Sequence, residues 1–133
     1  MKHSTKWASV GVTALTLTLF ASSTQAHAVD TIYWANPSGS YSSHGRGAFS
    51  TKGDLLRAYD DAKDGESACV TIYGRMVSSN KYEYRAVCAA GKGNSKDRNL
   101  NLVEGSAMKI QGWMYNESSG HDHNYGAWKS GWA

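Results

Sequence analysis

The positions of the two cysteines restrict the fold of this 133-residue chain more than any other feature. Cys69 and Cys88 lie in two strand-like segments, 68–77 and 81–89, which a short polar turn separates. A hairpin centred between residues 78 and 79 places the two cysteines directly opposite each other, in a non-hydrogen-bonded pair with Cα atoms about 4.5 Å apart. That distance suits a disulfide. The sequence therefore predicts a hairpin closed by a structural disulfide, which contributes about 3 kcal/mol by closing a loop of about 20 residues.

The same register predicts what the two faces of this hairpin carry. Its further cross-strand pairs are Tyr73–Tyr84 and Arg75–Tyr82 on the disulfide face, and Val70–Val87 and Ile72–Arg85 on the other face. Exposed Tyr and Arg side chains are typical of binding surfaces. Tyr73 and Tyr84 are also compatible with a core whose edge their hydroxyl groups reach, and we favour this second interpretation.

Residues 1–28 have the pattern of a secretory signal peptide. Lys2 and Lys6 precede an apolar run over 8–21, and a small-x-small cleavage pattern ends at Ala28. The run is too short and too rich in threonine for a retained membrane span. We therefore expect a secreted, extracellular protein, a location that favours disulfide formation.

Composition narrows the choice of partners. Residues 1–28 hold two of the 14 Lys and Arg residues and none of the 11 Asp and Glu residues, so their removal lowers the net charge from +3 to +1. A nearly neutral domain has no electrostatic preference for nucleic acid or for an anionic membrane, and we expect neither as a partner.

The remaining chain is rich in aromatic residues. Trp113, Trp128 and Trp132 fit either the core or a carbohydrate-binding surface, and we favour the core.

The segment 29–49 is predicted to be an extended arm. Ile32, Tyr33 and Trp34 form a short β-prone patch, and the Gly- and Ser-rich stretch that follows has the composition of a linker. A first β-strand followed by a long loop is the alternative. The predicted organisation is a signal peptide at 1–28, the arm at 29–49 and a compact domain at 50–133.

The segment 50–65 is predicted to be an amphipathic helix. It begins with a capping-box pattern, and Leu55 and Tyr59 fall on one helical face while the acidic pair at 60–61 faces water. Further strands are predicted at 99–103 and 107–115, and a fifth at 124–132 stays open.

No pattern typical of parallel crossovers occurs among the strands. The predicted fold class is therefore α+β, with one helix packed on a four- to five-stranded antiparallel sheet, one disulfide and an extended N-terminal arm. His121 and His123 would point the same way on a strand, but no third ligand with metal-site spacing accompanies them. We expect no metal and no cofactor.

Two short segments resemble the layout of small secreted microbial guanyl-specific ribonucleases. These are Tyr82-Glu83-Tyr84 on a strand and His123-Asn124-Tyr125 near the end of the chain. The resemblance implies Glu83 as general base, His123 as general acid and Arg85 as phosphate ligand. Such a reaction needs a base and an acid on opposite sides of phosphorus. The arginine-rich strand of that family is absent, so the ribonuclease stays an alternative.

A third segment, 68–73, resembles the start of small secreted proteinaceous α-amylase inhibitors. Those inhibitors carry a Trp-Arg-Tyr triplet on the following turn, where this chain has Gly74-Arg75-Met76. They also have two disulfides, whereas this chain can form one. An inhibitor of a secreted hydrolase is therefore a further alternative, without a particular target.

The layout of the whole chain is similar to the small adaptor subunit of secreted bacterial umbrella toxin particles. The shared features are a signal peptide, an arm with an aromatic patch and a disulfide-clipped β domain. The resemblance implies a non-catalytic adaptor of an antibacterial toxin complex, which joins a lectin-bearing subunit to a large repeat-containing stalk subunit. A β-edge would accept one of these partners. The residues expected to bind partners are Ile32, Tyr33, Trp34, Tyr41 and Arg46.

Overall fold

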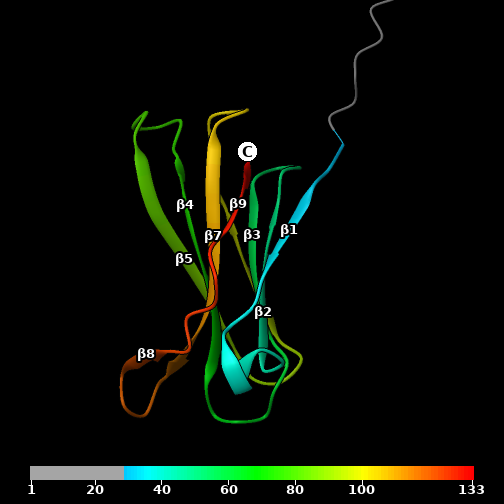
Figure 1. Ribbon diagram of the computed structural model, residues 1–133, viewed down its shortest axis with the longest axis vertical. Coiled ribbons are helices and arrows are strands. Elements are labelled where there is room, and N and C mark those ends of the chain that lie inside the picture. The colour runs from blue at the N-terminus through cyan, green and yellow to red at the C-terminus, as the bar shows by residue number, and fades with distance from the viewer. Residues whose placement is uncertain (1–28) are drawn as a thin grey trace, which may run out of the picture.

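Two antiparallel β-sheets packed face to face make up the part of the chain that the computed structural model describes, residues 29–133 (Figure 1). Sheet A has the strand order β1-β2-β3-β6, and sheet B has the order β5-β4-β7-β8, with β9 also paired to β7. The elements are β1 (Ile32–Ala35), the 3-10 turn η1 (Gly39–Tyr41), β2 (Gly45–Ser50), β3 (Leu55–Asp60), β4 (Ser67–Arg75), β5 (Tyr82–Ala90), β6 (Ser95–Asn99), β7 (Ala107–Asn116), β8 (His121–His123) and β9 (Lys129–Trp132). The predicted signal peptide, 1–28, lies outside the described residues.

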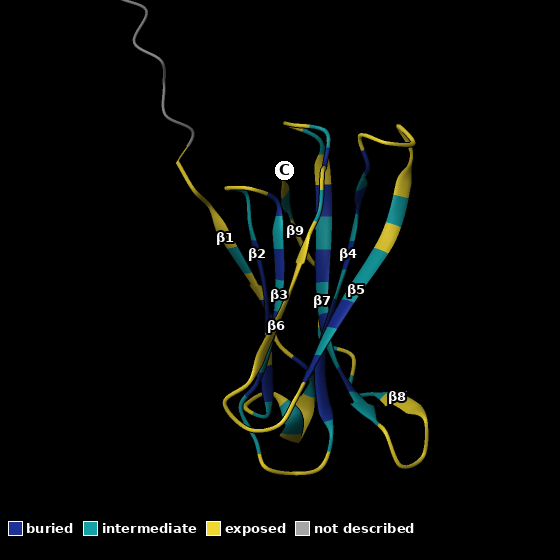
Figure 2. Cartoon of the chain, turned by 180° about the vertical axis from the view of Figure 1, so that it is seen from behind, coloured by how far each residue is buried: buried dark blue, intermediate teal, exposed yellow. Residues whose placement is uncertain are grey.

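The core lies between the sheets and follows from the alternation of side chains along each strand. Phe49 and Leu56 from sheet A meet Val70, Ile72 and Ile110 from sheet B, and all five are fully buried. On the edge strand β5, by contrast, exposed and partly buried residues alternate from Tyr82 to Arg85, and buried residues appear only at Val87 and Ala89 (Figure 2). This alternation leaves the outer faces of both sheets to aromatic and charged side chains.

Glycine permits the closest approach of the two sheets. A Cβ atom added to Gly45 would lie 2.2 Å from Cβ of Ala68, and one added to Gly47 would lie 2.4 Å from Cγ2 of Val70. Glycine inside a strand often marks such an approach. These glycines therefore belong to the packing of β2 on β4, and not to a flexible linker.

The predicted α+β class, with a helix packed on the sheet, is wrong. No α-helix occurs in residues 29–133, and 50–65 instead forms a turn followed by strand β3. In β3, Leu56, Ala58 and Asp60 point inward. Asp60, expected on a solvated helix face, is buried and accepts hydrogen bonds from the N–H groups of Ala62 (3.1 Å) and Gly91 (2.6 Å). Burial raises the pKa of its carboxyl group.

The predicted extended arm is also corrected. Residues 32–35 pair with 47–50, and 45–50 pair with 55–60, so this part of the chain supplies two strands of sheet A. Inward-facing and outward-facing side chains do alternate along these two strands, but over only a few residues. This alternation becomes visible only when the partner strands are aligned with it, and the paired residues lie from 5 positions apart (Ser50 with Leu55) to 18 positions apart (Ile32 with Ser50).

The predicted hairpin is confirmed. Strands β4 and β5 pair in the expected register, with Cys69 opposite Cys88 and their Cα atoms 4.1 Å apart in a disulfide. The predicted strand over 107–115 corresponds to β7. The predicted strand over 99–103 is displaced, because β6 ends at Asn99 and Leu102 makes only an isolated bridge to Met76.

Candidate binding surfaces

The structure separates the five residues predicted to bind partners. Ile32 and Trp34 point outward from β1, and Arg46 points outward from the neighbouring strand β2. Tyr33 instead packs against the core, and its hydroxyl group accepts a hydrogen bond from the N–H of Trp132 (3.3 Å). Tyr41 lies in η1, away from this face. Three of the five residues therefore share one exposed surface.

On the outer face of sheet A these residues join two others to form what we call the sheet A patch: Ile32, Trp34, Arg46, Arg57 and Tyr59. The rings of Trp34 and Tyr59 stack with their centroids 6.0 Å apart. The guanidinium carbon of Arg46 lies 4.6 Å from the centre of the Tyr59 ring and 5.6 Å from the centre of the Trp34 ring. Such cation–π contacts hold all three side chains in one arrangement.

The guanidinium groups of the two arginines in the sheet A patch also form ion pairs with carboxylates. Arg46 donates to both carboxylate oxygens of Asp61, at 2.7 and 3.1 Å, and this pairing raises the pKa of the guanidinium group. Arg57 donates to both oxygens of Asp97 across β3 and β6. Exposed pairs of this kind add little stability. Their effect here is to orient the arginines, which leaves a pre-organised aromatic and cationic surface.

The outer face of sheet B carries a second group of aromatic residues, which we call the sheet B patch: Tyr73, Tyr82, Tyr84 and Trp128. The ring of Tyr73 lies 4.5 Å from that of Tyr84 and 5.4 Å from that of Tyr82, centroid to centroid. Tyr84 is 58% exposed, so the preferred interpretation of the hairpin tyrosines as core residues does not hold for it. Tyr73 is partly buried beneath its neighbours.

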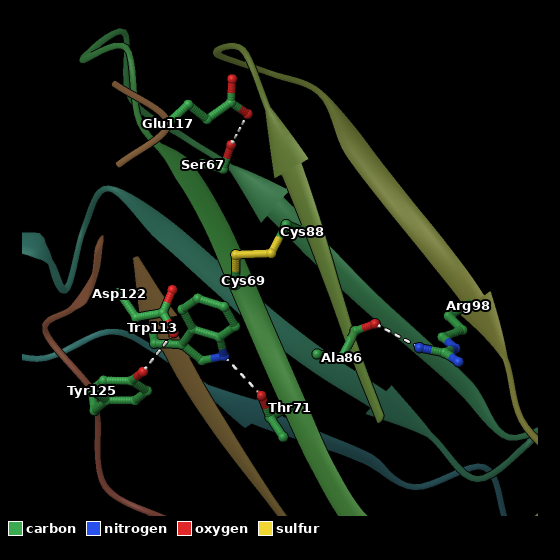
Figure 3. Close-up of a disulfide and its surroundings, with 10 residues drawn as sticks. All are labelled: Ser67, Cys69, Thr71, Ala86, Cys88, Arg98, Trp113, Glu117, Asp122 and Tyr125. Carbon is green, nitrogen blue, oxygen red and sulfur yellow. Dashed lines mark hydrogen bonds between the residues drawn. A yellow bond between two sulfur atoms is a disulfide. The ribbon is translucent and has the colours of Figure 1, made fainter. Parts of the chain in front are cut away.

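Trp113 occupies the middle of the same face, beside the disulfide (Figure 3). Its indole N–H donates to Oγ1 of Thr71 (2.8 Å), and its ring stacks on Tyr125 at 5.8 Å. Tyr125 in turn donates to Asp122 (3.0 Å), and burial together with this carboxylate raises the pKa of its hydroxyl group. Trp113 is thus fixed and partly buried, whereas Trp128 and Trp132 are exposed.

The structure does not bring the three ribonuclease-like residues together. Glu83 is bound to Arg85 (2.5 Å) on the edge strand β5, while His123 lies on β8, beyond both β4 and β7. The offset across the sheet is about 14 Å. Glu83 is also level with Met108 on β7, and His123 with Met114, which adds about 20 Å along the strands. Glu83 and His123 cannot act on one phosphate in this arrangement.

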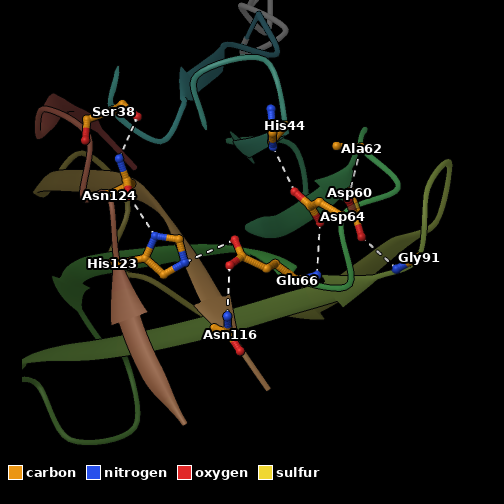
Figure 4. Close-up of polar contacts among 10 residues, drawn as sticks. All are labelled: Ser38, His44, Asp60, Ala62, Asp64, Glu66, Gly91, Asn116, His123 and Asn124. Atoms are coloured by element: carbon orange, nitrogen blue, oxygen red, sulfur yellow. Dashed lines mark hydrogen bonds and ion pairs between the residues drawn. The ribbon is translucent and has the colours of Figure 1, made fainter. Parts of the chain in front are cut away.

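His123 belongs instead to a polar cluster at one end of the sandwich (Figure 4). Its Nε2 atom faces Oε2 of Glu66 at 3.1 Å, and its Nδ1 atom faces Oδ1 of Asn124 at 2.6 Å. The Asn124 amide donates to the carbonyl group of Ser38 (3.2 Å), which fixes its orientation. Tyr41 packs edge-on against the ring of His123, at 4.9 Å. These contacts attach β8 to the chain around η1, so the cluster has a structural role.

A second histidine extends this cluster without creating a metal site. His44 binds Asp64 through Nδ1 (2.8 Å), and its ring packs in an edge-to-face arrangement with Tyr41 (4.8 Å). Within residues 29–133, no three His, Cys, Asp or Glu side chains are placed to hold one metal ion. The same residues include no helix that is long and apolar enough to cross a membrane.

Comparison with protein-family models, with curated proteins and with solved structures finds no match to this chain. The candidate site therefore depends on the geometry of the chain itself. The two patches are the surfaces on which exposed aromatic residues gather.

Sequence reasoning missed several residues of these patches. Tyr59 was expected on the apolar face of a helix, and no binding role was expected for Arg57. A period of two places Leu55, Arg57 and Tyr59 on one face, but six residues are too few for this period to be preferred over the helical period of 3.6. Trp128 carried no such signal, because it precedes β9 in a segment without regular structure.

Proposed function

We propose that this chain is a secreted, non-catalytic adaptor that holds two other extracellular proteins together, one on each outer face of its sandwich. The observation that carries the proposal is the pair of exposed aromatic patches on opposite sides of one rigid body. Tyr, Trp and Arg dominate the energetics of protein interfaces. Two such surfaces facing away from each other can bind two partners at once.

The proposed mechanism does not use a flexible arm. Trp34 and Arg46 are already ordered against Tyr59. Binding of a partner to the sheet A patch would therefore lose little side-chain conformational entropy. Similarly, the disulfide and the neighbouring strands hold Tyr73 and Tyr84 in place. Pre-organised surfaces of this kind suit a persistent assembly.

Secretion is part of the proposal and is supported by two features. Residues 1–28 have the pattern of a signal peptide, and the disulfide between Cys69 and Cys88 suits an oxidising compartment. The similarity to the umbrella toxin adaptor suggests the two partners: a lectin-bearing subunit and a large repeat-containing stalk subunit. An antibacterial role in such a complex is part of the same proposal.

The test is affinity purification of the tagged full-length protein from the culture supernatant of its native source, followed by mass spectrometry. Two proteins should co-purify with the unaltered chain. Trp34→Ala should release one of them and Tyr84→Ala the other, each with a loss of affinity of about 30-fold. Tyr125→Ala, an exposed aromatic residue outside both patches, serves as the matched control and should retain both proteins.

The melting temperature of each variant separates lost binding from lost folding. All three side chains are about half exposed, so their removal should change stability by no more than about 1 kcal/mol. The proposal fails if the same single protein is released by both patch variants. It also fails if neither variant releases any protein.

A further inference from the structure

A hollow of about 570 Å³ opens at the margin of the sheet B patch, where β9 lies against β7. Its walls include the rings of Tyr73, Tyr82 and Trp132, and Lys109 and Ser130 line it as well. A hollow of this size falls in the usual range for small ligands. It is bounded by rings on both sides, so it can hold a flat, partly apolar ligand.

Glycine at one position shapes the floor of this hollow. A Cβ atom added to Gly131 would lie 2.4 Å from Cε1 of Tyr33, so only glycine lets the Tyr33 ring pass behind β9. The hydroxyl group of Tyr33 accepts a hydrogen bond from the N–H of Trp132, which connects the floor of the hollow to its Trp132 wall. The hollow is therefore a built feature of the fold, with its rings held in place from behind.

The charge of this region has one sign. The outward positions of β4, β5 and β7 carry two charged residues, Arg75 and Lys109, and both are cationic. Lys109 has no ion pair with any residue between 29 and 133, and its Nζ atom lies 4.6 Å from the Trp128 ring centre and 5.5 Å from that of Tyr73. The rings position this cation without neutralising it, which leaves it available to an anion.

A neighbouring hollow provides an internal comparison. It shares Tyr33 and Trp132 with the first hollow, but Asp30, Glu104 and Lys52 line it, so it holds charges of both signs. The Asp30 carboxylate in this second hollow already accepts hydrogen bonds from Ser50 Oγ (2.7 Å) and from the N–H of Lys52. The first hollow of the two therefore differs in having a cation and no carboxylate among the described residues that line it.

We infer that this hollow binds an acidic oligosaccharide, a short chain of sugar rings that carry carboxylate groups. Sugar rings present apolar C–H faces that pack on exposed aromatic rings, and Tyr73, Tyr82 and Trp132 supply such rings. The carboxylate pairs with Lys109 in a charge-assisted contact. The hydroxyl groups of Ser130 and the tyrosines are placed to bind sugar hydroxyls. This inference does not depend on the adaptor function.

The experiment measures binding of the purified protein to tetragalacturonate and to its methyl ester, by calorimetry and tryptophan fluorescence. The two probes have the same rings and differ in charge. The acid form should bind at least about ten-fold more tightly than the ester, because a hydrogen bond to a charged group contributes that much. Lys109→Gln should weaken binding of the acid to the level of the ester and leave the ester unchanged.

Two further variants separate charge from stacking. Tyr82→Ala should weaken binding of both probes alike, because both lose the same ring contact. Lys96→Gln, the same substitution on the exposed strand β6 of the other sheet, is the matched control and should change neither affinity. Unchanged melting temperatures establish that each variant is folded.

Three results would overturn the inference. The first is an absence of saturable binding of the acid form up to about 10 mM, which corresponds to no useful affinity. The second is equal affinity for acid and ester. The third is that polyglutamate of similar length binds more tightly than tetragalacturonate, which would make the ligand an acidic peptide. None of these results bears on the Trp34→Ala or Tyr84→Ala outcomes, so the adaptor proposal stands or falls separately.

Discussion

The disulfide between Cys69 and Cys88 should contribute more stability than any other single contact on the outer face of sheet B. It closes a loop with a sequence separation of 19 residues. The chain-entropy relation assigns about 3 kcal/mol to a loop of that length. For a domain of about 100 residues, its loss should lower the melting temperature by roughly 10–20 °C. The perturbation is replacement of the cysteines by alanine, singly and together.

The single and double variants distinguish the cross-link from the burial of the individual side chains. Cys69 is fully buried beside Trp113, whereas Cys88 is partly exposed. If the cross-link carries the stability, then Cys69→Ala, Cys88→Ala and the double variant each lose the same free energy of unfolding, about 3 kcal/mol. If burial of the side chains provides the stability instead, the two single variants lose different amounts of unfolding free energy, and the double variant loses their sum.

Guanidinium denaturation followed by tryptophan fluorescence and far-UV circular dichroism measures these losses, with Trp113 as a nearby reporter. The denaturant m-value should rise in all three variants, because an unfolded chain without the cross-link exposes more surface. A loss in the double variant that equals the sum of the two single losses would refute the argument. A loss below about 1 kcal/mol in the double variant would refute it equally.

Three further perturbations test other parts of the fold. Gly47→Ala should lower the free energy of unfolding by about 1–3 kcal/mol, because its Cβ would overlap a side chain of β4. Thermal unfolding measures this loss, and an unchanged melting temperature would show that the sheets move apart without a loss of stability. Asp54→Ala should cost about 1–3 kcal/mol, because it leaves the buried N–H of Leu102 without its acceptor at 2.8 Å, whereas Asp54→Asn keeps an acceptor and should lose less. Arg57 lowers the pKa of Asp97, so this pair stabilises the fold above about pH 4 and loses its contribution as the pH falls through the folded-state pKa. Asp97→Asn should therefore reduce stability at pH 7 by no more than about 1 kcal/mol and reduce it less near pH 2, as equilibrium unfolding at the two pH values will reveal.

Local pairing could be predicted from sequence, and the hairpin of β4 and β5 is the example. Its strands are joined by a short turn, so the turn position determines which residues lie opposite each other. The disulfide and the Tyr73–Tyr84 pair both followed from that one register, but the register did not decide which face of the hairpin points outward. The same reasoning located β7, whose side chains alternate over ten residues.

The candidate site was predicted only in part. Ile32, Trp34 and Arg46 were expected to act together, and they do share a surface. They lie in a sheet, however, and not in an arm. Tyr59 completes their patch from a segment that was expected to be a helix, so its role depended on the fold.

The choice between helix and strand for 55–60 was made by tertiary structure. Leu55, Leu56 and Tyr59 fit a helical face as well as they fit a strand, and the segment is too short for its local preference to decide. Pairing with β2 on one side and β6 on the other satisfies its backbone and buries Leu56, Ala58 and Asp60.

The register of the hairpin and the position of the disulfide follow from local sequence, because both depend on residues that a short turn brings together. The sequence also showed that the domain is rich in aromatic residues, but not whether they lie in the core or on the surface. By contrast, the packing of Gly45 and Gly47 against β4 and the contact of Trp34 with Tyr59 arise only in the assembled sheets. The physical reason is distance along the chain, since a strand acquires its faces from partners that local sequence does not contain.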